Sequence, residues 1–454
     1  MGNKRQHILA DKNLVVIFCY APAGLGHLRV TDALFHGLPK EVEPLILGAQ
    51  DEFLTYTHRI TSIHPWLRSL MEWLQRGKPE TVFTLIYRWW LRHSAAKIEN
   101  QLATIVEQRV HKPKNVLVIA THFGLAHQIG AIKERFSQEH KVKLKLVVQV
   151  TDDSPQQMWY IEDADLIVAP SYLTKRKLEL YGEKAGLKKT KLTATSYPIS
   201  GKLNENLPKE LSHKRNAMFT ALGEEKIVVA IPISGAAVGL KYFIKLVDYL
   251  KINSRFVFVV VCKAKLQTEM FLGEMLKRDN VEVVAAGSDR EIVDKYEQLY
   301  VEQVVGAEVT KPSEQAFKAL ISPQRRGGSL LFLSEPVGRQ EYDNLNFLER
   351  HGLIPQAAQQ QKMWRLAAAN EPVDKENRDC ACGWRGLRLP KGARESARYI
   401  DWCFKNGVLA KMLECEAKAK TEDRHRDEMR GDGVDQFWKK VSSLLLQEGN
   451  LPEG

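Results

Sequence analysis

The sequence predicts an α/β protein with two domains, each built on a parallel sheet that helices cover on both faces. Short continuous apolar runs, separated by helical patterns, occur at 14–20, 43–48, 115–120, 144–150 and 165–169. The pattern then restarts, with strands at 226–231, 256–261, 281–286 and 330–333 and a helix at 240–251. Continuous apolar strands alternating with helices are typical of parallel sheets buried on both sides. A chain of 454 residues is long enough for two or three such domains.

The domain boundary is expected near residue 200, where the segment 201–208 has the composition of a linker. We therefore expect an N-terminal domain at 1–200 and a C-terminal domain at 201–355. The rest, 356–454, is predicted to be a charged helical tail, because it contains Lys/Glu-rich stretches and carries no catalytic pattern. The first domain includes a long helical excursion at 52–112.

Composition limits the partners and the compartment. The net charge of +11 favours an anionic partner, such as a phosphate-bearing small molecule or a membrane surface, although a basic surface without a partner is the alternative. No apolar stretch is long enough to span a bilayer, and the polar N-terminus lacks the core of a signal peptide. The six scattered cysteines do not form a disulfide framework, so we expect reduced thiols and a cytoplasmic protein without a metal site.

The turn after the first strand is the first candidate for a binding site. Gly24 and Gly26 form a small-residue turn between the strand at 14–20 and a helical segment, and His27 follows directly. Glycines allow a ligand to approach the backbone, and a helix N-terminus favours negative charge. His27 would then face the ligand with a titratable imidazole. The alternative is a tight turn with a surface histidine.

Two later strand ends also carry polar residues. Thr121-His122 follows the strand at 115–120, and Asp152-Asp153 follows the strand at 144–150, with Trp159 shortly after. Adjacent side chains alternate in direction, so only one of the two acids is expected to point into the site. That acid would orient His27 or a substrate hydroxyl; the alternative is a helix N-cap, which suits Asp153.

The C-terminal domain carries three candidate segments for an anionic, hydroxyl-rich ligand. Gly235 lies in the small-residue turn after the strand at 226–231, and Lys311 and Ser313 enter a helix at 310–316. The free backbone N–H groups of such a helix start, with Lys311, suit a phosphate. The third segment, 336–344, clusters amides and carboxylates of the kind that bind sugar hydroxyls.

The excursion at 52–112 is rich in aromatic and basic residues. Four of the nine tryptophans fall between 66 and 90, interleaved with arginines, and Phe83, Tyr87 and Trp90 share one helical face by spacing. One interpretation is a core face packed on the domain. The other is a surface that docks at a lipid headgroup layer or holds an amphipathic substrate. We expect no nucleic-acid binding, because no recognisable nucleic-acid module accompanies these residues.

Taken together, these segments resemble a family of glycosyltransferases. Residues 13–353 resemble the diacylglycerol glucosyl- and galactosyltransferases, such as monogalactosyldiacylglycerol synthase, and the related lipid-linked peptidoglycan N-acetylglucosaminyltransferase (family 28-like). The matching segments, in the same order, are Gly24-Leu25-Gly26-His27, Thr121-His122, Thr151-Asp152 with Trp159, residues 163–171, Ser196-Tyr197-Pro198-Ile199, Thr310-Lys311-Pro312, Gln340-Glu341-Tyr342-Asp343-Asn344 and Gly352.

The resemblance implies a GT-B fold, with two facing Rossmann-like domains, and a metal-independent inverting transferase. The C-terminal domain would hold a nucleoside diphosphate sugar, with UDP as the expected nucleotide and no further cofactor. The membrane-lipid acceptor would dock on the N-terminal domain, at the inner face of the plasma membrane. The implied catalytic residues are His27 and Asp152, and Gly24, Gly26, His122 and Trp159 would lie on the acceptor side. The implied donor-binding residues are Gly235, Lys311, Ser313, Gln315, Gln340, Glu341 and Asn344.

The donor loop departs from the family pattern. Ser313 and Glu314 replace two glycines, and Lys318 stands where an acidic residue usually holds the ribose. Two alternatives follow: a non-catalytic GT-B protein that binds a nucleotide or a partner, and a nucleotide-sugar 2-epimerase, which shares the fold. The oligomeric state, the sugar and the acceptor are left open by the sequence.

Overall fold

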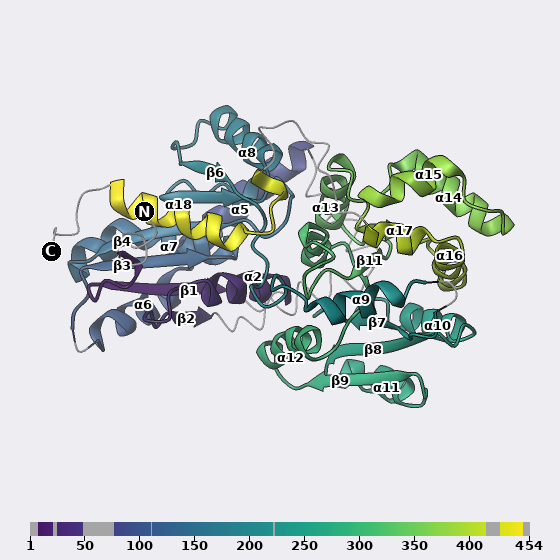
Figure 1. Cartoon of the computed structure of the whole chain (residues 1–454). Coiled ribbons are helices and arrows are strands. Elements are labelled where there is room, and N and C mark those ends of the chain that lie inside the picture. The colour runs from purple at the N-terminus through teal and green to yellow at the C-terminus, as the bar shows by residue number, and fades with distance from the viewer. Residues whose placement is uncertain are drawn as a thin grey trace. The chain divides into compact units, whose positions relative to one another are not determined.

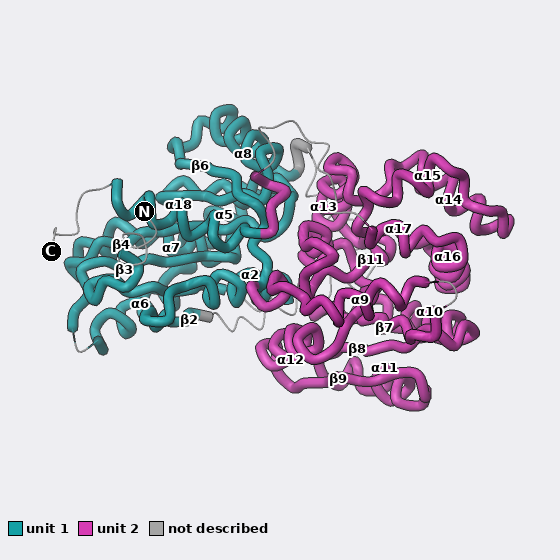
Figure 2. The backbone as a smooth tube through the Cα atoms, viewed as in Figure 1, with its two compact units in different colours: residues 1–200, 432–454 teal, residues 201–431 magenta. Residues whose placement is uncertain are grey.

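The computed structural model describes residues 8–20, 25–48, 77–109, 111–220, 223–414 and 427–447. The chain divides into two compact units, drawn in two colours in Figure 2. Unit 1 comprises residues 1–200 and 432–454, and unit 2 comprises residues 201–431. The chain therefore passes between the units twice, at 200/201 and at 431/432.

Unit 1 is built on a six-stranded parallel sheet with the order β2-β1-β3-β4-β5-β6 (Figure 1). Its strands are β1 (Leu14–Tyr20), β2 (Leu45–Gly48), β3 (Asn115–Ala120), β4 (Lys143–Gln149), β5 (Leu166–Ala169) and β6 (Leu192–Ala194). The predicted runs match the first five strands, and β6 was not predicted. Strands β3 and β5 are almost entirely apolar, because helices cover both faces of the sheet, whereas β4 carries two lysines near its start.

The helices of unit 1 follow the strands in α/β alternation. They are α2 (Leu25–His36), α5 (Gly77–His93), α6 (Ala96–Glu107), α7 (Phe123–His140), the short η1 (Gln157–Trp159), α8 (Tyr172–Lys184) and the C-terminal α18 (Gly433–Gln447). In Figure 1 the yellow α18 lies among the purple and blue elements of unit 1. The Trp438 indole N–H donates to the carbonyl of Leu34 at 3.0 Å, and its ring meets Phe18 edge-on. Helix α18 thus packs on β1 and α2.

Unit 2 has a second six-stranded parallel sheet, in the order β12-β11-β10-β7-β8-β9. Its strands are β7 (Ile227–Pro232), β8 (Phe256–Lys263), β9 (Val281–Ala286), β10 (Ala307–Thr310), β11 (Leu330–Leu333) and β12 (Gly386–Arg388). Counted within the unit, this is the strand order of the Rossmann fold. The expected α/β class, with two domains each built on a parallel sheet, is confirmed.

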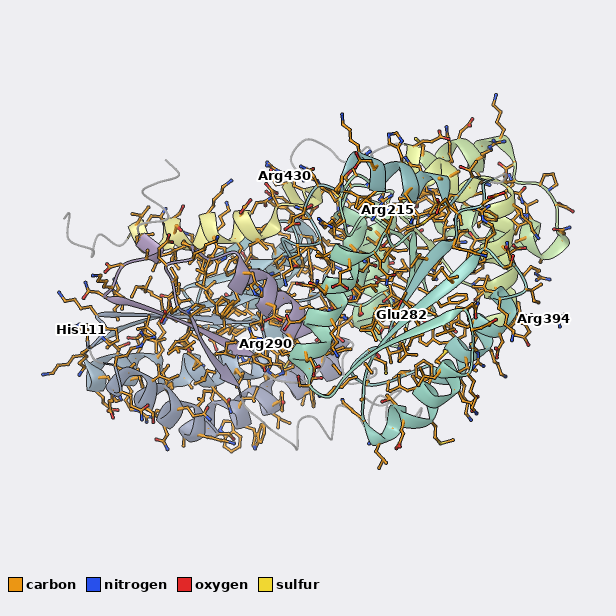
Figure 3. All side chains as sticks on the ribbon, turned by 60° about the horizontal axis from the view of Figure 1, so that its bottom comes forward. His111, Arg215, Glu282, Arg290, Arg394 and Arg430 are labelled. Carbon is orange, nitrogen blue, oxygen red and sulfur yellow. The ribbon has the colours of Figure 1, made fainter. Side chains whose placement is uncertain are left out.

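The helices of unit 2 are α9 (Lys209–Ala217), α10 (Leu240–Leu250), α11 (Leu266–Leu276), α12 (Asp289–Glu302), η2 (Glu314–Leu320), α13 (Arg339–Arg350), α14 (Ala357–Ala369), α15 (Lys375–Cys380), η3 (Ala381–Gly383), α16 (Ala393–Lys405) and α17 (Val408–Glu414). The buried guanidinium of Arg215 (labelled in Figure 3) donates to the carbonyls of Pro323, Arg325 and Arg326. These bonds stabilise the turn between η2 and β11, because the three carbonyls lie outside the strands and have no ladder partner there.

The segment 356–454 differs from the single helical tail that the sequence suggested. Its first part belongs to unit 2, where β12 pairs with β11 and α16 contributes Tyr399, Ile400 and Trp402 to the core. Its last part, α18, belongs to unit 1. The local sequence is polar because these helices are amphipathic and only one face of each is buried.

The cysteines also differ from the expectation of reduced thiols throughout. Cys19, Cys262, Cys380 and Cys403 are free thiols, whereas Cys382 is disulfide-bonded. Burial raises the pKa of Cys19 to about 12, so this thiol stays protonated at neutral pH. None of the described helices is both long and apolar enough to cross a bilayer.

Candidate functional site

The strand order of unit 1 directs attention to one point of its sheet. Strand β1 lies between β2 and β3, so the connections that leave β1 and β3 diverge at their carboxyl ends. Ligands of open parallel sheets bind at such a switch point. His27, in the first turn of α2 after β1, and Thr121-His122, after β3, both belong to this point.

The imidazole of His27 is held in one orientation. Its Nδ1 lies 2.7 Å from the carbonyl oxygen of Thr121 and 3.3 Å from the Thr151 hydroxyl. A carbonyl only accepts, so Nδ1 carries the proton and donates it. In the neutral ring Nε2 is then the nitrogen that takes up a proton, which is the property a general base requires.

Two threonine hydroxyls fix the helix turn that carries His27. The Thr31 hydroxyl donates to the carbonyl of His27 at 2.8 Å and lies 2.7 Å from the hydroxyl of Thr121. Because the single hydroxyl proton of Thr31 is donated to the His27 carbonyl, Thr121 is the donor in the bond between the two hydroxyls. Both threonines are fully buried. The first turn of α2 is therefore tied to the end of β3, a role that the sequence pattern did not reveal for Thr31.

A row of rings connects His27 with His122 and Trp159. The centroids of His27 and His122 are 5.2 Å apart, His122 stacks on Phe123 at 4.8 Å, and Phe123 meets Trp159 edge-on at 5.5 Å. The structure thus brings together three of the predicted acceptor-side and catalytic residues. Trp159 itself is buried and contributes to this site by packing against Phe123.

The structure separates the two neighbouring acids. The carboxylate of Asp153 accepts hydrogen bonds from the hydroxyls of Ser171 and, at 2.8 Å, Thr174, at the start of α8. Asp153 is therefore a buried structural acid, and Asp152 is the half-buried one. The catalytic role of Asp152 stays a prediction. Gly26 lies in the first turn of α2, and Gly24 lies outside the described residues.

Unit 2 has its own switch point, between β7 and β10. The loop after β7 holds Gly235, whose carbonyl lies 3.4 Å from the ammonium nitrogen of Lys265. In the same loop Ala237 has φ +52°, and Gly239, the N-cap of α10, has φ +84°. A left-handed alanine is strained, and strain of this kind gathers at ligand sites.

The loop after β10 is joined to the first turn of α13. The ammonium of Lys311 lies 3.7 Å from one carboxylate oxygen of Glu341, and the other oxygen accepts the Val337 N–H at 2.6 Å. The buried Asn344 amide donates to the carbonyl of Pro312 at 3.2 Å. Burial raises the pKa of Glu341, and Lys311 opposes this shift. Lys311, Glu341 and Asn344 are thus brought together, with the half-buried Gln340 on the same turn.

Two further residues of the predicted donor loop are Gln315 and Ser313. Gln315 is buried, and its side-chain oxygen accepts the Tyr296 hydroxyl at 3.2 Å. Ser313 caps η2 without a side-chain hydrogen bond to its backbone and is half-buried. Their donor-binding roles stay predictions, and the contact with Tyr296 shows that Gln315 has a structural partner inside unit 2.

Lys318 is buried beneath this loop. Its ammonium donates to Glu308 at 2.7 Å, to the Tyr300 hydroxyl at 2.6 Å and to the Tyr296 hydroxyl at 2.9 Å. The pKa of Tyr300 is raised well above its ordinary value, first by burial and then by the charge of Glu308. The position that differs from the family pattern therefore forms a buried ion pair. Sequence reasoning missed Glu308 because a charged residue inside a short strand weakens the strand pattern.

Among the described residues, no group of three or more histidine, cysteine, aspartate or glutamate side chains is placed to hold a metal ion. The groups at the unit 2 switch point that suit a phosphate are instead the ammonium groups of Lys265 and Lys311 and the backbone N–H groups of the loops.

Comparison with protein-family profiles and with curated proteins finds no match to this chain. Solved structures do show similarity. A UDP-GlcNAc 2-epimerase from Neisseria meningitidis bound to UDP-GlcNAc is 11% identical, with TM-score 0.43, over 96% of this chain and 99% of that chain. UGT89C1 from Arabidopsis thaliana complexed with UDP-L-rhamnose is 12% identical, with TM-score 0.47, over 95% of this chain and 99% of that chain. At this level of similarity we take nothing about ligand or activity from these proteins.

Proposed function

We propose that this protein is a glycosyltransferase of the diacylglycerol glycosyltransferase type, which moves a sugar from a nucleoside diphosphate to a lipid-type acceptor. The observation that carries the proposal is the orientation of His27, whose Nδ1 donates to Thr121 and whose Nε2 is thereby the proton-accepting nitrogen. This imidazole stands at the switch point of a Rossmann-like sheet, where ligands of such sheets bind.

In the proposed reaction, Nε2 of His27 removes the proton from an acceptor hydroxyl. The hydroxyl oxygen then forms a bond to the anomeric carbon while the bond from that carbon to the diphosphate oxygen breaks. The reaction inverts the configuration at this carbon, and the nucleoside diphosphate leaves with the electron pair. General-base catalysis of this kind contributes about 10²- to 10⁴-fold.

Unit 2 supplies what the leaving diphosphate requires in this proposal. The ammonium groups of Lys265 and Lys311, with the backbone N–H groups of the loop after β7, would stabilise its negative charge. The first turn of α13, with Gln340, Glu341 and Asn344, would hold the sugar hydroxyls. The resemblance implies metal-independent chemistry, in which these cations and N–H groups would take that role.

Helix α5 supports a lipid acceptor, because its burial pattern is inverted. Its buried face carries Glu80, Thr84 and Arg88, with Leu91 at the C-terminal end. Arg88 pairs with Glu162, and Glu80 accepts the N–H of Gln157 at 3.0 Å. Its exposed face carries large apolar side chains: Val82 (58% exposed), Leu85 (52%), Ile86 (65%), Trp89 (63%) and Trp90 (40%). A helix with a polar face held by the protein and an exposed apolar face rich in tryptophan suits a lipid interface. The proposed location is accordingly peripheral, on the inner face of the plasma membrane.

The lipid interface is tested with vesicles. Binding to phosphatidylglycerol vesicles should fall at least ten-fold when Ile86 and Trp89 are both changed to serine, because about 2–4 kcal/mol of apolar burial is lost. The matched control is Leu266→Ser with Met270→Ser, two side chains of α11 that are 82% and 85% exposed in unit 2. Equal loss in both variants, or none in the first, would contradict docking by α5.

The reaction is tested in two stages. Thermal stability is first measured against UDP, GDP and their sugars, since a ligand that binds the native state raises the melting temperature. The donor identified in this way is then incubated with diacylglycerol vesicles, and glycolipid formation is measured. Binding without glycolipid, together with epimerised nucleotide sugar, would support the 2-epimerase alternative. Neither binding nor product would support the non-catalytic alternative.

A further inference from the structure

Thr151 is the second contact of the His27 imidazole within unit 1. It follows β4, is 2% exposed, and places its hydroxyl oxygen 3.3 Å from Nδ1. The Nδ1 proton is directed at the carbonyl of Thr121. The Thr151 hydroxyl packs beside the same nitrogen and limits rotation of the ring. A shift of Thr151 would therefore allow the ring to turn.

The backbone of Thr151 is held by Tyr197. The Tyr197 hydroxyl donates to the Thr151 carbonyl at 2.9 Å, and both residues are buried. The two residues are 46 positions apart in the chain, so this bond is tertiary. A buried carbonyl that loses its donor is costly, so the bond fixes the position of Thr151.

Tyr197 is itself fixed by the C-terminal helix. The backbone N–H of Ser196 donates to the side-chain oxygen of Gln436 at 3.1 Å. A Cβ atom on Gly433 would lie 2.2 Å from the carbonyl oxygen of Tyr197, so the start of α18 approaches this backbone as closely as only glycine allows. Within unit 1, the segment that leads to the passage at 200/201 and the segment that follows 431/432 are therefore packed together at Tyr197.

We propose that Tyr197 is a positioning residue, which fixes the imidazole of His27 for proton removal through Thr151 and is itself held by α18. This inference rests on the proposed role of His27 as the base. Tyr197 does not touch the reacting atoms. It acts by holding Thr151 beside Nδ1 of His27, so that the Nδ1–H group keeps pointing at the carbonyl of Thr121.

The test is Tyr197→Phe, which removes the hydroxyl and keeps the ring. We expect kcat to fall about ten-fold with an unchanged KM for the nucleotide sugar, because one orienting hydrogen bond is lost. The matched control is Tyr160→Phe, since the Tyr160 hydroxyl is also buried in unit 1 and donates to the carbonyl of Lys188 at 3.1 Å. The Tyr160 hydroxyl also accepts the N–H of Thr190 at 3.3 Å, so this control should lose at least as much stability and keep kcat.

Thr151 offers a second pair of variants. Thr151→Val keeps the shape and removes the hydroxyl, whereas Thr151→Ser keeps the hydroxyl. Positioning predicts that kcat falls in the valine variant and recovers in the serine variant. A purely structural role would make both changes follow thermal stability.

A readout that does not depend on activity separates this inference from the proposed function. In protein labelled with ¹⁵N-histidine, the ring signals of His27, assigned by their loss in His27→Gln, should shift in Tyr197→Phe and stay fixed in Tyr160→Phe. If the wild type transfers no sugar and these signals shift, the positioning holds and the proposed function fails. Unchanged signals and unchanged kcat in Tyr197→Phe would overturn the positioning role.

Discussion

The switch points of the two sheets differ in chemistry, although each arises where successive connections of a parallel sheet run in opposite directions. In unit 1, β1 and β3 end at an imidazole surrounded by threonine hydroxyls and a carbonyl. In unit 2, β7 and β10 end at the ammonium groups of Lys265 and Lys311, with a buried ion pair beneath them. The first set of groups suits proton transfer, and the second suits a bound anion. Parallel-sheet topology thus fixes where each site lies, and the side chains decide what each site does.

The largest expected effect breaks the unit 1 site. His27→Ala should lower sugar transfer about 10²- to 10⁴-fold, because no other described side chain replaces the oriented base. Nucleotide-induced stabilisation should stay, since that binding is assigned to unit 2. Sugar transfer is measured as a rate, and nucleotide binding is measured as a shift in melting temperature. The control is His36→Ala, at the exposed end of the same helix. Loss of nucleotide binding in His27→Ala would contradict the assignment of proton transfer to unit 1 and nucleotide binding to unit 2.

The next effect tests the charge beneath the unit 2 site. Lys318→Met should destabilise the protein by about 3–5 kcal/mol, because it leaves the carboxylate of Glu308 buried without its cation. Adding Glu308→Gln should recover part of this loss. The free energy of unfolding is measured in urea, with the exposed, ion-paired Lys277→Met as control. A loss below 1 kcal/mol would show that the pair contributes no more than a surface pair.

Acid should weaken unit 1 through a buried histidine. Burial, aided by Arg88, lowers the pKa of His127 from 6.5 to about 3. Below pH 6.5 the unfolded chain binds a proton that the folded state excludes, so this contribution is complete above pH 6.5 and is lost as the pH falls toward 3. The loss is about 1.4 kcal/mol per pH unit at most.

This prediction is checked by urea unfolding between pH 7 and pH 4. The slope with pH should become smaller in His127→Gln, which cannot take up a proton, and should persist in His111→Gln, whose side chain is exposed (labelled in Figure 3). Equal slopes in the wild type and His127→Gln would show that His127 does not govern acid stability.

The smallest effect sharpens the comparison on the unit 2 side. Lys311→Met should weaken nucleotide-sugar binding about ten-fold, or 1.4 kcal/mol, because one cation near the diphosphate is removed. The rate of transfer at saturating donor should change less than the affinity, which is measured by titration calorimetry. An unchanged affinity would place the diphosphate away from the β10 loop.

Much of the fold is predictable from the sequence, and the failures have physical causes. The apolar strands were predicted to within two residues at each end, because strands buried on both faces are largely apolar. The short strands β6, β10 and β12 escaped because each is short and contains a polar residue, whereas the similarly short β5 and β11 are wholly apolar. In β10 the buried Glu308 also breaks the pattern, and its charge is compensated by Lys318, ten residues later, together with the hydroxyls of Tyr296 and Tyr300.

Helix α5 shows a different kind of failure. Its spacing predicted that Phe83, Tyr87 and Trp90 share a face, and the rings do stack in that order. The usual rule would then bury the apolar face, whereas the buried side here carries Glu80, Thr84 and Arg88. The reason lies in η1 and the loop after it, where Gln157 and Glu162 supply the polar partners. Local periodicity contains no information about those partners.

The sequence by itself determined the α/β class, the two sheets and the loops that hold Gly235 and Lys311, because the apolar pattern of a strand and the turn residues after it are local properties. Only the tertiary structure decided which of Asp152 and Asp153 is structural, and that Lys318 turns inward. It also decided that α18 returns to unit 1, where Trp438 binds the Leu34 carbonyl 404 residues away. These outcomes depend on partners far apart in the chain. Burying a polar group costs free energy unless it has a hydrogen-bond partner, and the partner comes close only when the chain folds.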